Sequence, residues 1–312
     1  MALTRARTAA PRGHDPGVPP SGSPRPAARA RLAALMPNRW SVAATPGTIF
    51  VILAFAVPMV MVLVQSFTNP SPHNYSIALG SGIFQRAIVA TFVMALVVTA
   101  ISLVIGYPYA YAMVRSGQAM RGFLLVMLMI SFWTSLLVRT FAWEVLLQDT
   151  GVINTALINL HIIKQPLSMM HTTFSVYVGM VHILAPYLIL ALYAQMRTIS
   201  PDLEMAARGL GAKQSTAFWR VTLPLSLPGA VGGSVLVFVL ALGFYITPEM
   251  LGTGTGTYIG QAIVNQVEQL LQTGVGAAES VLLLAMVVIV LALAARFIGL
   301  GKILGIGHRS ER

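Results

Sequence analysis

Cysteine is absent from the 312-residue chain, and charged side chains make up only 9% of it. The missing cysteine excludes disulfide frameworks, thiolate-bound zinc, iron–sulfur clusters and cysteine nucleophiles. The scarcity of charge argues against an ordinary soluble enzyme, because soluble domains carry about 25% charged residues. What the chain has instead is apolar, since 56% of its residues are hydrophobic.

The short motifs of nucleotide-binding and catalytic sites are also missing. A P-loop requires Gly-x4-Gly-Lys-Ser/Thr between a strand and a helix, and the fragment at 299–302 lacks that spacing and the hydroxyl. The Gly-Thr repeat at 252–257 follows no strand, so we expect a flexible turn there. No His-Glu-x-x-His or Gly-x-Ser-x-Gly pattern occurs. We therefore expect no catalytic residue, no metal site and no cofactor in this chain.

Six stretches approach the roughly 20 apolar residues that a helix needs to cross the hydrocarbon layer. They cover residues 48–67, 87–114, 122–143, 171–196, 221–248 and 281–295, the last needing a few more residues on each side. The pattern predicts an all-α polytopic membrane protein with six transmembrane helices. Two shorter runs, 151–163 and 258–271, are expected to lie at the membrane surface or to cap a cavity.

The placement of lysine and arginine predicts the orientation of these spans. Basic residues concentrate in the N-terminal segment, in the loops after spans two and four, and at the C-terminus. On this rule both termini and the loop between spans four and five are cytoplasmic. The net charge of +11 is then a topology signal, and contact with anionic membrane lipid explains it without a nucleic-acid partner.

Residues 1–40 differ in composition from the rest of the chain. They are rich in Pro, Ala, Arg and Gly, with Asp15 as the only acid. Such a segment buries too little apolar surface to fold, so we predict a disordered basic cytoplasmic tail. An organelle transit peptide is the competing interpretation, because those peptides are also rich in arginine and poor in acids. Residues 41–312 form the predicted transmembrane domain.

The loop between spans four and five, residues 200–224, is unlike the other loops. Ser200 can cap a helix that has Pro201 at its first position, and Asp202 and Glu204 suit the positive end of that helix. Apolar residues recur at helical spacing until the glycines at 209 and 211 loosen or end the helix. A second short helix over 214–222 is expected to stop at Pro224.

The stretch MAARGLGAKQSTAFWRVTLP at 205–224 resembles the EAA loop of importer-type ABC permeases. The positions that match the family pattern are Ala206, Ala207, Gly211, Phe218 and Pro224. Met205 departs from it, because it stands where the family usually has glutamate, and Glu204 precedes it. The resemblance implies that this loop is a coupling helix seated in a cleft of a cytoplasmic ATPase.

The resemblance covers the chain from about residue 48 to its C-terminus. The segments at 131–154, 179–196 and 240–252 are similar to permeases of the spermidine/putrescine group. This similarity implies a type I importer permease in a bacterial inner membrane. It also implies partners: cytoplasmic ATPase subunits that use ATP, a homologous second permease, and an extracytoplasmic solute-binding protein.

A few polar and aromatic residues near the predicted outer ends of the spans are candidates for the substrate path. Ionisable groups at membrane depth usually face an aqueous path or a partner, and aromatic faces attract cations. The candidates are Trp133, Glu144, Asp149, Tyr245 and Glu249. The competing interpretation of Glu144 is that it forms an ion pair with Arg139. The competing interpretation of Asp149 is that it is a solvated charge in a loop.

Three other functions remain open at this point. The chain could be an ABC permease for another solute, such as an opine, an amino-acid derivative or another cation. It could be a secondary carrier or channel that works without an ATPase. It could also be a structural membrane scaffold, although a scaffold leaves the loop at 200–224 unexplained.

Overall fold

The computed structural model describes residues 39–68, 72–253 and 258–298. The predicted tail therefore lies outside the described residues except for its last two positions, and so do most of the Gly-Thr repeat and Lys302. Two compact units divide the chain, Met1–Val57 and Pro58–Arg312. Helix α2, Arg39–Thr68, crosses that boundary.

Every regular element of the described residues is a helix, which confirms the all-α prediction. After α2 the order is α3 (Asn74–Gly80), α4 (Gly82–Arg115), α5 (Gln118–Trp133), α6 (Leu136–Leu147), α7 (Val152–Asn159), α8 (Thr173–Met196), α9 (Pro201–Gly209), α10 (Gln214–Ala217), the π-helix η1 (Phe218–Thr222), α11 (Leu223–Leu242), α12 (Ile246–Leu251), α13 (Ile259–Val264), the π-helix η2 (Asn265–Gln269) and α14 (Thr273–Ile298). Within the described ranges, five helices are long and apolar enough to span a membrane, and counting one bent pair of helices as a single span gives six.

The third predicted span is not one straight helix. The segments Gln118–Trp133 and Leu136–Asn159 meet at an angle of 97°, whereas the sequence predicted a continuous helix over 122–143. Thr134 has extended backbone at the break and Ser135 is also non-helical, and the Thr134 hydroxyl donates to the Ile130 carbonyl oxygen at 2.8 Å. Such side chains offer the backbone hydrogen bonds that compete with a helix, which explains the bend inside an apolar run.

The centre of the second unit is formed by α4, α8 and α11, which pack against one another. Small residues let these helices approach closely, as they do in membrane bundles. A Cβ atom added at Gly106 of α4 would lie 2.9 Å from Leu188 Cδ2 of α8. One added at Gly233 of α11 would lie 3.1 Å from the Ala191 Cβ. Larger residues at either glycine would push the helices apart.

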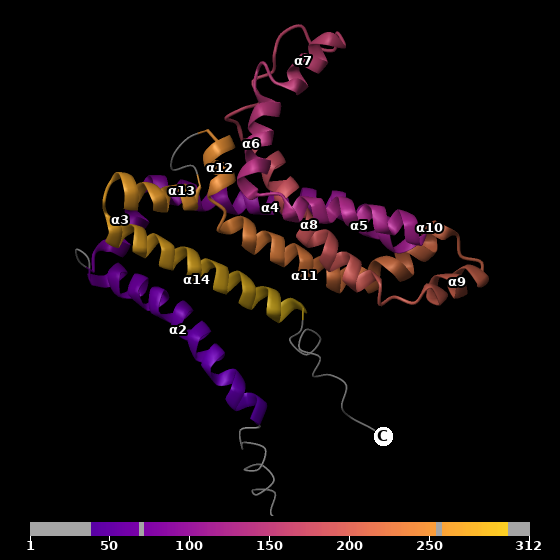
Figure 1. Cartoon of the computed structure of the whole chain (residues 1–312), viewed down its shortest axis with the longest axis horizontal. Helices are drawn as coiled ribbons and strands as arrows, with labels where there is room; N and C mark the ends of the chain where they lie inside the picture. Colours follow the sequence, from indigo (N-terminus) through magenta and orange to yellow (C-terminus); the bar gives the residue numbers. More distant parts are fainter. Residues whose placement is uncertain (1–38, 69–71, 254–257, 299–312) are drawn as a thin grey trace, which may run out of the picture. The chain divides into compact units, whose positions relative to one another are not determined.

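The two ends of α4 mark two different regions of the bundle. Its last residue, Arg115, contacts α9, while Phe84 and Ala87 near its start pack with α13. A helix of 34 residues is about 50 Å long at 1.5 Å per residue. Figure 1 shows α9 and α10 at one end of the bundle, with α12 and α13 at the other. We call these the α9 end and the α13 end.

The last two predicted spans have different bounds in the structure. The fifth was expected to continue to residue 248, but α11 ends at Leu242 and Pro248 belongs to the separate helix α12. The sixth begins at Thr273, eight residues before the predicted start at 281. This earlier start places Glu279 inside the apolar helix.

Candidate functional site

The start of α9 forms as the sequence predicted. The Ser200 hydroxyl oxygen accepts a hydrogen bond from the backbone N–H of Asp202 at 3.3 Å, and Pro201 occupies the first turn. The helix ends at Gly209, and Gly211 has φ +89°. That left-handed conformation is open to glycine and costly for residues with a Cβ. The chain turns there toward α10 and the base of α11.

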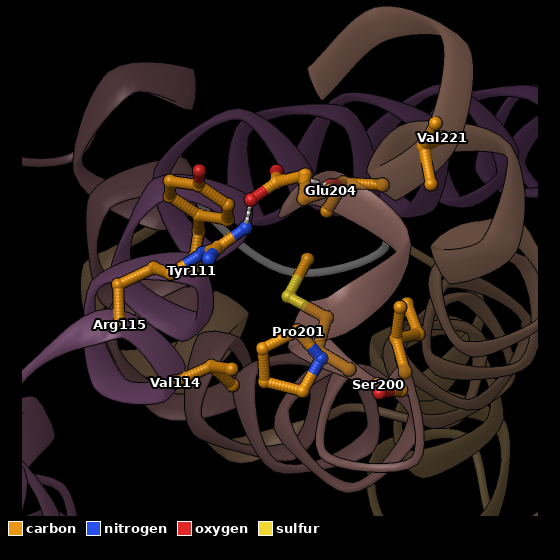
Figure 2. A pocket seen from close by; sticks show the side chains of 10 residues that line it. Tyr111, Val114, Arg115, Ser200, Pro201, Glu204 and Val221 are labelled. Carbon is orange, nitrogen blue, oxygen red and sulfur yellow. Dashed lines mark hydrogen bonds and ion pairs between the residues drawn. The ribbon is translucent and has the colours of Figure 1, made fainter. Parts of the chain in front are cut away.

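Glu204 is the buried residue of α9, with 8% of its surface exposed. Its carboxylate forms an ion pair with Arg115, the last residue of α4 (Figure 2). The Thr222 hydroxyl donates to Glu204 Oε1 at 2.6 Å. One carboxylate therefore joins α9 to both α4 and the start of α11. We call Arg115, Glu204 and Thr222 the loop anchor.

Aromatic side chains support the loop anchor on one side. The Arg115 guanidinium lies over the Tyr111 ring, 5.3 Å from its centroid, and the Tyr111 and Phe218 rings meet edge to face at 5.3 Å. A cavity of about 230 Å³ lies beside the ion pair. Figure 2 shows Ser200, Pro201 and Val221 among the residues that line it.

Pro224 does not stop the second helix of the loop, contrary to the prediction. α10, η1 and α11 follow without a break, and Pro224 lies in the first turn of α11. Leu223 donates its backbone N–H to the Phe218 carbonyl oxygen, the i→i−5 bond of a π-helix. Proline lacks a donor and clashes with the preceding turn of a regular α-helix. The wider π-turn before it lets the helix continue.

The loop also carries apolar side chains that the described residues leave uncovered, on α9, just after it and on η1. The exposed fractions are 57% for Met205, 90% for Leu210 and 64% for Trp219. Ala206 is also exposed and Ala207 half-buried. Two adjacent residues at the start of the motif therefore have opposite environments, because the Glu204 side chain is buried within the protein and the Met205 side chain is exposed.

At the α13 end, Tyr245 and Glu249 lie near a buried amide. Gln261 Nε2 donates to Glu249 Oε2 at 2.9 Å and to the Pro248 carbonyl oxygen at 3.2 Å. Burial raises the pKa of Tyr245 above its ordinary value, and the charges of Glu249 and Glu268 raise it further. This end of the bundle thus concentrates negative charge beside a neutral phenol.

Glu144 and Asp149 share a different cavity. It has a volume of about 290 Å³ and is lined by Glu144, Gln148, Asp149, Thr150, Ser168, Met170 and His171. His171 Nδ1 lies 3.2 Å from the Gly252 carbonyl oxygen, which ties the wall of this cavity to the end of α12. Two carboxylates in one polar cavity can attract a cation.

Trp133 joins neither group. It is 90% exposed at the end of α5, where the bent pair breaks. The sequence-predicted path residues therefore lie in three places: Tyr245 with Glu249, Glu144 with Asp149, and Trp133 alone.

Several polar residues at these sites were missed by the sequence analysis. The sequence pattern indicates only a topology charge at Arg115, and it places Gln261 in a run at the membrane surface or over a cavity without a role for its amide. Glu279 fell outside the predicted sixth span, although it is only 1% exposed in α14. An acid at the edge of an apolar run was the signal that could have identified it.

Residues 30–304 match the family described as binding-protein-dependent transport system inner membrane component. The spermidine/putrescine transport system permease protein PotB of Salmonella typhimurium is 34% identical over 190 residues, which are 61% of this chain and 66% of that protein, just under two thirds. PotB of Haemophilus influenzae is 31% identical over 219 residues, covering 67% of this chain and 77% of the relative. The inner membrane ABC transporter permease protein YdcU of Escherichia coli is 31% identical over 211 residues, 63% of each chain.

Solved structures show the same fold at lower sequence identity. A bacterial ABC transporter involved in the import of the acidic polysaccharide alginate aligns with a TM-score of 0.63 and 18% identity, over 85% of this chain and 99% of that one. The MetNI methionine ABC transporter aligns with a TM-score of 0.52 and 20% identity, over 68% and 93%. The chain belongs to the family of binding-protein-dependent transport system inner membrane components.

Proposed function

We propose that the chain is the permease subunit of an ATP-driven importer and translocates polyamines such as spermidine and putrescine. The observation that carries the importer role is the loop anchor, which fixes α9 to α4 and α11 while an apolar face stays uncovered. The names of the PotB relatives favour the polyamine class. The carboxylates Glu144, Asp149, Glu249 and Glu268 suit a substrate with several positive charges.

The geometry supports a mechanical role for α9. A partner that binds Met205 on α9, Leu210 just after it and Trp219 on η1 would move this part of the loop together, since α9 is only nine residues long. Arg115 and Thr222 would transmit that movement to α4 and α11. Both helices belong to the packed centre, so a displacement at the α9 end changes the packing toward the α13 end.

The partners follow from this arrangement. Cytoplasmic ATPase subunits would cover the exposed apolar residues of the loop, and a homologous second permease would complete the path. An extracytoplasmic binding protein would deliver the solute to the α13 end. This assignment puts the α9 end and both termini in the cytoplasm of a bacterium, as the distribution of arginine and lysine predicts. The ATPase subunits would use the ATP, and this chain would need no cofactor.

Reconstitution with and without the ATPase tests the proposal. The chain is purified gently with its accompanying subunits, placed in proteoliposomes with ATP inside or outside, and assayed for uptake of labelled spermidine. We expect uptake only with the ATPase and ATP. Uptake driven by an ion gradient in the chain alone would overturn the importer role in favour of a secondary carrier. Transport of another solute with ATP would overturn only the polyamine assignment.

A further inference from the structure

The start of α14 contains a carboxylate that none of the contacts described above uses. Glu279 is 1% exposed, and its Oε2 atom is buried without a hydrogen-bond partner in the described part of the chain. An isolated charge in an apolar surrounding is costly unless it is paired. Such residues within membrane spans usually mark a path or face a partner.

The neighbours of Glu279 on its own helix show which way it faces. Leu282, Leu283 and Met286, which follow it by three, four and seven residues, pack against Phe84 of α4 and the start of α13. Residues at these intervals share one face of a helix. Glu279 therefore lies on the face of α14 that packs toward α4 and α13.

The residue one turn before Glu279 contacts the π-helix η2. A Cβ atom added at Gly276 would lie 2.5 Å from Val267 Cγ2 and 3.5 Å from Gln266 Cβ. Gln266 also has a buried oxygen, Oε1, without a partner among the described residues. Two acceptor oxygens thus lie on packed elements, η2 and α14, and neither receives a donor.

A primary ammonium group fits this chemistry better than a metal ion. Ammonium has three donors and no acceptor, which matches one carboxylate and one amide oxygen. Metal ions such as Ca²⁺ take six or more oxygen ligands, and the described residues contain no group of three or more acidic, histidine or cysteine ligands that could hold one.

Two other carboxylates, Glu249 and Glu268, lie on α12 and η2, which precede α14 in the chain. The charges of Glu249 and Glu268 both act on Tyr245, and Glu249 is bonded to Gln261 of α13. Glu268 is exposed on η2, so it lies nearer to solvent than Glu279. Positive charge would pass from the exposed acid on η2 to the buried one on α14.

The segment formed by α13 and η2, which packs against α14, has features of a movable segment. The π-helix η2 is a conformation that occurs often at functional sites. Leu271, between η2 and α14, has φ +53°, a left-handed conformation that is strained for a residue other than glycine. The exposed turn at 268–272 ends this segment, so its displacement would open the way to Glu279.

We propose that Glu279, with Gln266, is a binding position for one ammonium group of the transported cation beneath the α13–η2 segment. This inference rests on the proposed function, because it assigns a residue to the solute of that transporter. The proposed site extends the substrate path predicted from the sequence beyond Glu249 and into the sixth span.

Spermidine uptake by variants of the reconstituted transporter tests the site. Glu279→Gln keeps the shape and removes the charge, so we expect the half-saturating concentration to rise about tenfold, the size of one charged hydrogen bond. Glu279→Asp keeps the charge and is expected to lie between wild type and Glu279→Gln. Ser280→Ala is the control at the same depth, because its hydroxyl bonds only to the Gly276 carbonyl oxygen of its own helix.

Stability separates a binding role from a structural one. Removing a buried, unpartnered charge leaves the thermal unfolding temperature of the Glu279→Gln assembly unchanged or higher, while uptake falls. An unfolding temperature that falls together with uptake would assign Glu279 to structure and overturn the inference. Unchanged uptake would also overturn it.

Chemical labelling gives a measurement that does not depend on polyamine import. A hydrophobic carbodiimide modifies Glu279 in the complete transporter, and mass spectrometry measures the extent. We expect protection by 1,4-diaminobutane and none by 1,4-butanediol, a neutral molecule of the same length. Equal modification with both would overturn the inference even if spermidine is imported. Protection in a transporter that imports a different amine would support the site while overturning the polyamine assignment.

Discussion

Arg115 at the end of α4 and Glu204 in the first turn of α9 form an ion pair, which fixes the loop to the second span of the bundle. Glu204 as a whole residue is 8% exposed, whereas the side chain of Arg115 is 39% exposed. The same carboxylate accepts from Thr222. A residue next to the usual glutamate position of the motif thus makes internal contacts, and the motif position itself, Met205, remains available to a partner.

Replacing Glu204 with glutamine should uncouple ATP hydrolysis from uptake. The amide loses the charge that pairs with Arg115, and a partly exposed ion pair contributes about 1 kcal/mol, so we expect uptake per ATP to fall about fivefold. ATP hydrolysis and uptake are measured together in proteoliposomes. Asp202→Asn, an exposed acid of the same helix, is the matched control. Equal coupling ratios in the two variants would contradict the role of the loop anchor.

The glycines at 209 and 211 should respond in opposite ways to substitution. Gly211 has φ +89°, so Gly211→Val should cost about 2 kcal/mol of backbone strain and displace α10 relative to α9. Gly209 ends a regular helix with open space around its Cα, so Gly209→Ala should be neutral or stabilising by up to about 1 kcal/mol.

Uptake and membrane insertion are measured for both glycine variants. We expect normal insertion in each case and reduced ATP-driven uptake only in Gly211→Val. If Gly211→Val transports as well as wild type, the turn between α9 and α10 has no part in coupling.

The sequence predicted most of the helices and the start of α9, because apolar runs and capping residues are local signals. It did not predict the bend after Trp133, because the break depends on two polar residues within a run whose average is apolar. Packing also contributes there, since the Thr140 hydroxyl of α6 lies 3.2 Å from the Thr247 hydroxyl of α12. That contact joins segments far apart in the chain.

The candidate sites were predictable only in part for the same reason. Glu249 and Tyr245 could be selected as candidates from the sequence, because they lie at the end of the predicted fifth span. The partner of Glu204 could not, because the pair depends on where α4 ends in space relative to α9. Glu279 lies just before the apolar run at 281–295 and was not among the candidates, and its burial follows from packing against α13 and η2.

The exposed apolar residues of the loop, Met205, Leu210 and Trp219, should be required for assembly with the ATPase. Leu210 is 90% exposed, so Leu210→Ser should leave the fold of this chain intact. Loss of one buried leucine contact costs about 2 kcal/mol at an interface, so we expect about thirtyfold weaker binding of the ATPase. Co-purification and titration with the ATPase measure this change. Leu160→Ser, an exposed leucine after α7, is the control, and equal ATPase binding by both variants would refute the interface.

Glu249→Gln should weaken uptake of a polycation without affecting assembly. Gln261 still bonds to the Pro248 carbonyl oxygen, so α12 and α13 keep one of their links. Loss of a half-buried carboxylate on the proposed substrate path should raise the half-saturating concentration about fivefold, equivalent to about 1 kcal/mol.

Salt provides an internal check on the Glu249 variant. The difference from wild type should shrink as ionic strength rises, because salt screens partly exposed charges. Gln269→Ala, at an exposed position of η2, serves as the uncharged control. A salt-independent difference, or none at low salt, would remove Glu249 from the substrate path.

Tyr258 should make the stability of the chain fall at high pH. Burial raises its pKa to about 12, with a further contribution from Tyr177, whereas tyrosine in the unfolded chain titrates near pH 10. The folded state therefore retains the proton while the unfolded state loses it. The resulting stability is complete below about pH 10 and decreases toward pH 12, by about 2 to 3 kcal/mol. Thermal unfolding measured between pH 8 and about pH 12 should show a smaller decrease for Tyr258→Phe than for wild type. Tyr75→Phe, at the start of α3, is the control for the other tyrosines, and equal pH dependence in the two variants would show that Tyr258 is not protected from ionisation.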